Sequence, residues 1–277
     1  MQGRIVKLVS GDYTVYANNE YIVCKPLGIF RHKNISPKVG DLVTIENNMI
    51  IDIEERKNDL IRPSICNVDK VFILTSFVKP DVNLNLLDRL ISVAEWENIN
   101  IILVFTKSDL IDVEKYRKEI DYYQNLYPVY LMPGNIEEIK KEIDNNICVV
   151  AGQTGVGKST LINKLDPSLD LKTQEISLAL GRGKHTTRHV ELHKIGKGWI
   201  ADTPGFGITN LEMDLLALSH SFIDFFNVDC KFTTCLHVAE PGCVVKEKVD
   251  NGEILKSRYE NYLLFVDEIK SRKRSWE

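Results

Sequence analysis

One segment, residues 152–159, constrains the fold of this 277-residue chain more than any other feature. Its sequence, GQTGVGKS, matches the pattern GxxxxGK(S/T), in which glycines let the backbone wrap around phosphate groups with its N–H groups pointing inward. An apolar run, residues 147–151, precedes the segment, and residues 160–165 after it have a helical pattern. A strand, this loop and a helix in that order predict a P-loop.

The residue types of this loop also predict what it binds. Lys158 is expected to neutralise the β- and γ-phosphates of a nucleotide, and the Ser159 hydroxyl is expected to ligate Mg²⁺. The alternative is a chance glycine-rich turn, and the flanking strand and helix argue against it. The residues expected to contact the nucleotide here are Gly152, Gln153, Thr154, Gly155, Val156, Gly157, Lys158, Ser159 and Thr160.

Two further segments, each at the end of an apolar strand, complete the expected nucleotide site. In Asp202-Thr203-Pro204-Gly205, the Asp202 carboxylate can reach Mg²⁺ through water, and the Gly205 N–H can meet the γ-phosphate. Thr106-Lys107-Ser108-Asp109 is similar to the guanine motif NKxD, whose aspartate accepts from guanine N1–H and the exocyclic amine. Adenine lacks that pair of donors, so the motif predicts guanine binding. Thr106 replaces the usual asparagine, a change that can lower the affinity.

Residues 181–189, between the two phosphate motifs, have the polar, glycine-bearing sequence of a first switch loop. Thr186 or Thr187 could add a hydroxyl ligand to Mg²⁺ in the GTP state. The residue after DTPG is Phe206, which cannot orient a water molecule, so another group must do so. His185 is the candidate catalytic residue because a neutral imidazole can hold or deprotonate water. The alternative for His185 is a loop residue that faces RNA or solvent.

The motifs occur in the order base, phosphate and magnesium, whereas ordinary small GTPases begin with the phosphate loop. A fold is set by which strands are neighbours, so a chain can be cut and rejoined where its termini lie close together. From Pro63 onward, apolar strands alternate with helices, which predicts an α/β fold with a mostly parallel, doubly wound sheet. Strands are expected at residues 71–75, 101–106, 129–132, 147–151 and 199–202, and helices at 84–97 and 137–143.

The N-terminal residues 1–62 contain short β-type runs separated by turn residues, and they predict a small barrel of the OB or SH3-like kind. Such barrels often bind RNA, and the aromatic side chains of the runs could either stack on bases or pack inside the barrel. These aromatic residues are Tyr13, Tyr16, Tyr21 and Phe30. The expected strands are residues 4–9, 13–17, 21–24, 42–46 and 49–53.

Three cysteines and a histidine cluster near the C-terminus in the pattern Cys230-x4-Cys235-x-His237-x5-Cys243. Three thiolates and one imidazole are the set that tetrahedral structural zinc favours. A segment this small could hardly bury enough apolar surface to fold unaided, and the metal is therefore expected to stabilise its fold. The alternative is three buried free cysteines and a core histidine. Helices are expected on both sides, at residues 211–226 and around 259–269. In the second helix one apolar face is expected to carry Tyr259, Tyr262, Leu263, Val266 and Ile269.

Length, charge and hydropathy limit the class of protein. The chain fits two or three modest domains, and the expected boundaries are 1–62 for the barrel, 63–210 for the nucleotide domain and 211–277 for the helical zinc domain. The apolar runs are too short to cross a membrane, and residues 1–6 lack the features of a secretion signal, so a cytoplasmic location is expected. A net charge of −4 argues against binding to nucleic acid chiefly through bulk charge.

The combination of motifs resembles one family, the circularly permuted GTPases typified by ribosome small-subunit-dependent GTPase A. The resemblance rests on the N-terminal barrel, TKSD before GQTGVGKST, KHTT, DTPGF, and the Cys/His block followed by Arg258-Tyr259. It implies an OB-fold, a permuted GTPase centre and a zinc domain. It also implies binding to the small ribosomal subunit and its rRNA late in assembly, with GTP hydrolysis stimulated by the subunit. Residues 131–135 depart from the Ser-Ala-type loop expected against the base.

Other functions remain open on the same residues. The chain could be a GTP sensor that acts on another partner, or a zinc- and RNA-binding assembly protein whose nucleotide site hardly turns over. A P-loop kinase is disfavoured, because DTPG and TKSD serve a switch and a guanine site and no acceptor-site motif is apparent. A ribosome-assembly GTPase that acts as a monomer is the favoured function.

Overall fold

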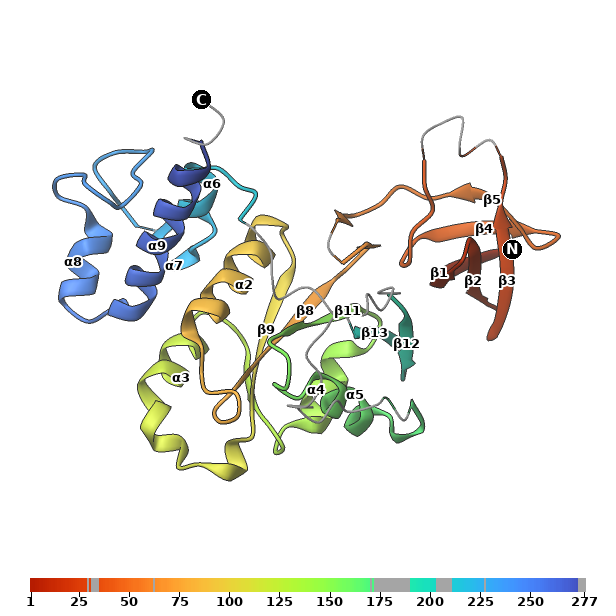
Figure 1. The fold of residues 1–277 in the computed structure, drawn as a ribbon, viewed down its shortest axis with the longest axis horizontal. Helices are drawn as coiled ribbons and strands as arrows, with labels where there is room; N and C mark the ends of the chain where they lie inside the picture. The colour runs from red at the N-terminus through yellow and green to blue at the C-terminus, as the bar shows by residue number, and fades with distance from the viewer. Residues whose placement is uncertain are drawn as a thin grey trace, which may run out of the picture. The chain divides into compact units, whose positions relative to one another are not determined.

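The structure, a computed structural model, describes residues 1–28, 30, 35–61, 63–169, 171, 190–202, 211–226 and 228–273. The chain forms two compact units, each made of several segments, whose helices and strands are drawn in Figure 1. The first unit contains Met1–Lys70, Ile136–Val150 and Lys158–Phe206, and the second contains Val71–Asn135, Ala151–Gly157 and Gly207–Glu277.

The N-terminal strands close into a five-stranded barrel in the order β1-β2-β3-β5-β4. The neighbouring pairs are antiparallel except β3 and β5, which run parallel. This OB-like arrangement confirms the predicted barrel. The strands are β1 (Gln2–Val9), β2 (Asp12–Ala17), β3 (Glu20–Pro26), β4 (Leu42–Glu46) and β5 (Met49–Ile53).

The aromatic residues of the barrel divide between its core and its surface. Tyr13 and Phe30 are only 7% and 5% exposed, so they pack inside rather than offer a ring to a base. Tyr21 keeps 60% of its surface exposed, and its ring centre lies 5.1 Å from that of Tyr16. Tyr16 in turn packs edge-on against Trp199 of β13, within the first unit. Of these rings, Tyr21 is therefore the one most open to solvent.

A six-stranded sheet has the order β10-β9-β8-β11-β13-β12. Strand β9 runs parallel to β10, and β11 runs parallel to β13, which confirms the predicted α/β fold and its mostly parallel sheet. Strand β12 pairs antiparallel with β13 and is an addition to the predicted strands. The strands are β8 (Lys70–Ser76), β9 (Asn100–Thr106), β10 (Val129–Leu131), β11 (Ile147–Gly152), β12 (Leu192–Ile195) and β13 (Gly198–Asp202).

The helices that alternate with these strands are α2 (Leu84–Trp96), α3 (Arg117–Gln124), α4 (Ile136–Ile143) and α5 (Lys158–Leu165). Helix α2 begins after Asn83, whose side chain accepts from the Leu86 N–H at 2.9 Å and so caps the first turn. The two predicted helices match α2 and α4 to within a residue at each end. Helix α3 is an addition, and it buries only Ile120 and Tyr123, too few apolar residues to mark a helical period.

The C-terminal part of the second unit is helical, and no strand occurs in the described residues after Asp202. The predicted helical stretch over residues 211–226 is in fact two short helices, because the chain turns at Ser221 and Phe222. The predicted apolar face of the last helix is confirmed, since Tyr262, Val266 and Ile269 are buried. The helices are α6 (Leu215–His220), α7 (Ile223–Phe226), α8 (Val244–Asp250) and α9 (Lys256–Lys273).

A fully buried arginine, Arg258 of α9, joins this helical part to α2 and α3 within the second unit. Its guanidinium donates to Asp88 of α2 at 2.6 Å and to Asp224 of α7 at 2.7 Å. Tyr123 of α3 and Asn261 of α9 donate to the two oxygens of Asp88. Burial raises the pKa of Asp88. Burial also acts to raise the pKa of Asp224, but Arg258 holds it below its usual value.

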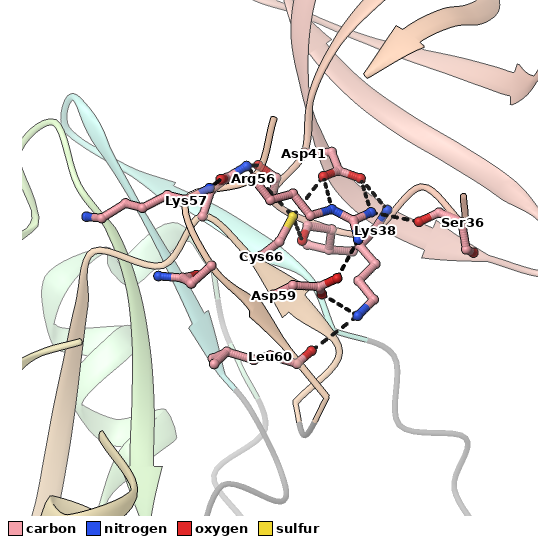
Figure 2. A network of polar contacts seen from close by, with 12 residues as sticks. Ser36, Lys38, Asp41, Arg56, Lys57, Asp59, Leu60 and Cys66 are labelled. Atoms are coloured by element: carbon pink, nitrogen blue, oxygen red, sulfur yellow. Dashed lines mark hydrogen bonds and ion pairs between the residues drawn. The ribbon is translucent and has the colours of Figure 1, made fainter. Parts of the chain in front are cut away.

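Polar side chains fasten the segment after β5 to the barrel (Figure 2). The fully buried Asp41 carboxylate accepts from Arg56 Nε at 2.7 Å, from Arg56 Nη2 at 2.8 Å and from the Cys66 thiol at 2.9 Å. Arg56 also donates to Asp59, which pairs with Lys38. Burial raises the pKa of Cys66, so its thiol keeps the proton that it donates.

Asp41, Arg56 and Cys66 are called the Asp41 clasp below. The segment contains β6 (Asp59–Leu60) and β7 (Ile65–Cys66).

Among the described residues, no helix is both long and apolar enough to cross a membrane.

Candidate nucleotide-binding site and metal centre

The P-loop lies between β11 and α5, in the predicted strand, loop and helix context. Gly152, Gly155 and Gly157 have φ angles of 136°, 81° and 105°, in the region that side-chain-bearing residues rarely adopt. A side chain at Gly152 would also come within 2.4 Å of the Leu74 carbonyl oxygen. The tight path of the loop therefore requires glycine at this position.

The residues after the glycines begin helix α5. Lys158 and Ser159 are its first two residues and are half-buried, while Thr154 in the loop and Thr160 in the helix are exposed. The N-terminal end of a helix carries partial positive charge, and this favours a phosphate group. The arrangement is therefore suited to the phosphate contacts predicted for this loop.

The TKSD motif lies against the P-loop within the second unit. The Thr106 hydroxyl, at the end of β9, donates to the Val156 carbonyl at 2.6 Å. Lys107 has a left-handed backbone, with φ 60°, and its ammonium donates to the Gly155 carbonyl at 3.1 Å and to two carbonyls in the loop after β8. Burial lowers the pKa of Lys107. Two segments some fifty positions apart in the chain are thus joined by side chains of one and backbone of the other.

The remaining residues of the motif contact the loop after β10. The hydroxyl and the N–H of Ser108 both donate to the Met132 carbonyl, at 2.7 and 3.0 Å. The Asn135 side chain accepts from the Leu131 N–H at 2.9 Å and closes this loop. The loop therefore lies beside TKSD even though its sequence departs from the expected Ser-Ala type. Asp109 is exposed, which leaves its carboxylate open to a ligand.

The magnesium motif is described only at its start. Asp202 is the last residue of β13, and in the parallel pairing of β13 with β11 it lies opposite Val150, just before the P-loop. Parallel strands end at the same edge of a sheet, so the motif begins where the P-loop begins. The predicted site residues Gly205, His185, Thr186 and Thr187 lie outside the described residues, as does Phe206.

The cysteine and histidine cluster forms a compact group in the second unit, with all four ligand atoms within 4.8 Å of one another. His237 Nδ1 lies 3.4 Å from the Cys243 sulfur and 3.7 Å from the Cys230 sulfur. The Cys243 sulfur lies 3.9 Å from that of Cys235 and 4.0 Å from that of Cys230. Tetrahedral bonds of about 2.3 Å to sulfur and 2.0 Å to nitrogen would place such atoms about 3.5 to 3.8 Å apart. The cluster could hold a metal ion.

Neighbouring side chains fix the loop that carries these ligands. The Glu240 carboxylate accepts from the backbone N–H groups of Leu236, Val238 and Ala239, at 2.9, 2.8 and 3.0 Å. From α9, the Tyr259 hydroxyl donates to the His237 carbonyl at 2.7 Å. Burial lowers the pKa of His237, which keeps its ring neutral and able to act as a ligand. The sequence marks Tyr259 as part of an apolar helix face and of the Arg258-Tyr259 pair, but it gives no sign of the bond from Tyr259 to His237 or of the Glu240 bonds.

A P-loop, a TKSD motif bonded to it and a magnesium motif that starts at the same sheet edge define a P-loop GTPase fold of permuted motif order. The chain matches the family model for the RsgA GTPase over residues 53–212 and that for the RsgA N-terminal domain over residues 2–50. It therefore belongs to the RsgA GTPase family and is a GTP hydrolase.

Similar proteins extend over nearly the whole chain. It is 46% identical to the small ribosomal subunit biogenesis GTPase RsgA 2 of Oceanobacillus iheyensis and 44% identical to RsgA of a Geobacillus species, with 98% of each chain covered in both cases. It is also similar to the crystal structure of YjeQ from Thermotoga maritima, with a TM-score of 0.85 at 34% identity over 97% of this chain and 98% of that one. A second crystal structure, of YloQ, a circularly permuted GTPase, gives a TM-score of 0.82 at 36% identity over 98% of this chain and 95% of that one. The predicted membership of the permuted GTPases is confirmed.

Proposed function

We propose that this chain acts in late maturation of the small ribosomal subunit and hydrolyses GTP to GDP and phosphate with turnover that the subunit stimulates. The observation that supports GTP as the nucleotide is the bond from Thr106 to Val156, which holds the TKSD guanine motif against the P-loop. The names of the relatives, small ribosomal subunit biogenesis GTPase, support the choice of partner.

In this proposal each site residue has one role at the nucleotide. Asp109 accepts from the guanine N1–H and amine, and Lys158 neutralises the β- and γ-phosphates. Ser159 ligates Mg²⁺ and Asp202 reaches it through water, so that the ion offsets charge on the transferred phosphate. The other assignments are Thr186 or Thr187 as a further Mg²⁺ ligand, Gly205 as an N–H donor to the γ-phosphate, and His185 as the group that holds the water.

The same proposal covers the organisation of the chain. Residues 1–62 form the barrel domain, 63–210 the GTPase domain and 211–277 a domain held by structural zinc. The donor set and spacing of Cys230, Cys235, His237 and Cys243 support zinc. The protein works as a cytoplasmic monomer that contacts the rRNA of the subunit, and the OB-like barrel supports an RNA contact.

Phosphate release from GTP, measured with and without purified small subunits, tests the function. Added subunits are expected to raise the turnover by about tenfold or more, because a partner that completes the catalytic site of a GTPase can raise turnover by far more than that. Lys158→Ala is expected to abolish both the basal and the stimulated turnover. Lys164→Ala, an exposed change in the last turn of the same helix, is the matched control and is expected to leave both rates unchanged.

Two outcomes would contradict the proposal. GTP turnover that subunits do not change, with a different copurifying partner, would favour a GTP sensor. RNA binding without measurable wild-type turnover would favour a zinc- and RNA-binding assembly protein. His185→Ala is expected to lose turnover while GTP binding is retained, and unchanged turnover would remove His185 from its assigned role.

A further inference from the structure

Thr106, which stands where a guanine motif usually has asparagine, is enclosed by backbone on two sides. The residue is only 3% exposed, and its hydroxyl lies 2.6 Å from the Val156 carbonyl oxygen of the P-loop. The carbonyl of Thr75, near the end of β8, lies 3.5 Å from the same hydroxyl, a much longer contact. The short bond to Val156 is therefore the main polar contact of this side chain.

The number of hydrogens on this side chain limits what else it can bind. A hydroxyl has a single hydrogen to donate, whereas an asparagine amide has two. Asparagine can therefore donate to a loop carbonyl and to a base at the same time. Guanine presents acceptors at N7 and O6 in addition to the donors that Asp109 would meet. With its hydrogen given to Val156, Thr106 has none left for either base acceptor.

We propose that Thr106 is a positioning residue for the P-loop and takes no part in reading the base, so that side-chain selection of guanine falls to Asp109. This inference rests on the proposed guanine site, and it assigns loop positioning and base recognition in that site to different residues. Of the two hydrogen bonds that an asparagine amide could donate here, threonine makes the one to the loop carbonyl and cannot make the one to the base.

The bond to Val156 acts at a residue that lies between two glycines of the loop. Gly155 and Gly157, on either side of Val156, have φ angles of 81° and 105° and no side chain to restrict them. In a planar trans peptide the C=O and N–H groups point in opposite directions. Holding the Val156 carbonyl therefore also fixes the Gly157 N–H, directed away from Thr106. Lys107 holds the preceding carbonyl, that of Gly155, in the same way.

A loop held in its binding shape loses less conformational freedom when a ligand arrives, so its affinity is higher. Loss of the Thr106 hydroxyl is thus expected to weaken the binding of any nucleotide with the same phosphates, whatever its base acceptors. A residue that reads the base would behave differently, because its loss would weaken only the nucleotides that carry the acceptor it meets. This difference separates the two roles.

Dissociation constants for GDP and 7-deaza-GDP, in which a C–H replaces the N7 acceptor, provide the test. The wild type is expected to bind the two equally, within about twofold. Thr106→Val, which keeps the shape and removes the hydroxyl, is expected to weaken both by about fivefold to tenfold, in the upper part of the usual range for a lost hydrogen bond. Thr106→Ser is expected to restore both, and Thr106→Asn is expected to bind GDP several-fold more tightly than 7-deaza-GDP.

Two results would overturn the inference. One is a wild type that prefers GDP over 7-deaza-GDP, with the preference lost in Thr106→Val. The other is an unchanged GDP affinity in Thr106→Val. Thermal unfolding without nucleotide checks that the variants are folded, and equal binding of GDP and 7-deaza-GDP by the wild type supports the absence of a contact to N7 even if one of them is not. Equal binding of ADP and GDP by the wild type would instead count against the proposed guanine site itself.

Discussion

Arg258 is a single side chain on which the packing of four helices in the second unit depends. It is fully buried between the carboxylates of Asp88 and Asp224, and Tyr123 and Asn261 complete the bonds of Asp88. Removing one partner of a buried ion pair leaves an uncompensated charge and costs about 3–5 kcal/mol. We expect Arg258→Met to lower the free energy of unfolding by about that amount, measured by urea denaturation.

Arg117 of α3 provides the control for this change, because its ion pairs with Glu114 and Asp121 are exposed. Arg117→Met is expected to change the stability by less than about 0.5 kcal/mol. A similarly small loss for Arg258→Met would show that the buried cluster adds little to the stability of this unit.

The loop between α7 and α8 carries most of the candidate metal ligands, and its fold is expected to depend on a metal. It carries Cys230, Cys235 and His237, and Cys243 directly precedes α8. A structural zinc site supplies folding free energy directly, so chelation is expected to lower the melting temperature of the wild type. Cys235→Ser is expected to lower both the zinc content and the melting temperature. Elemental analysis and thermal unfolding measure the two effects.

Cys24→Ser is the matched control, because Cys24 is buried in β3 of the barrel and belongs to a different unit. It is expected to leave the zinc content unchanged. Wild-type protein that contains no zinc and melts at the same temperature with and without chelator would rule out the structural role of the metal.

Across the whole chain, features with a strong local pattern could be predicted and features set by distant partners could not. Strands β8 and β11 are nearly continuous buried apolar runs, and the P-loop has an apolar strand before it and a helix after it. Strand β12 has only four residues and owes its place to its pairing with β13. Sequence shows that Thr106 departs from asparagine, but it does not show which of many backbone carbonyls a hydroxyl meets.

The same limit applies to the barrel and the metal loop. The short β-type runs between turn residues predict the barrel, but the side-chain partners of Asp41 lie 15 and 25 positions further along, in a segment with little periodicity. The ligand spacing predicts the metal cluster, whereas the Glu240 and Tyr259 bonds that fix its loop depend on how the chain turns. A local pattern therefore identifies a site, and its supporting contacts come from the tertiary structure.

The Asp41 clasp bears on the order in which the protein can fold while it is being synthesised. A growing chain that has reached Ile53 contains all five barrel strands, but it lacks both Arg56 and Cys66. A barrel closed at that point would hold the Asp41 carboxylate by the Lys38 N–H but without the Arg56 guanidinium, and a carboxylate without a cationic partner is costly to bury. We expect chains halted at residue 53 to be cut quickly by protease and chains halted at residue 70 to resist it, and equal resistance would contradict this order. The segment after β5 would then set when the barrel closes, because closure would wait until Arg56 and Cys66 have been made.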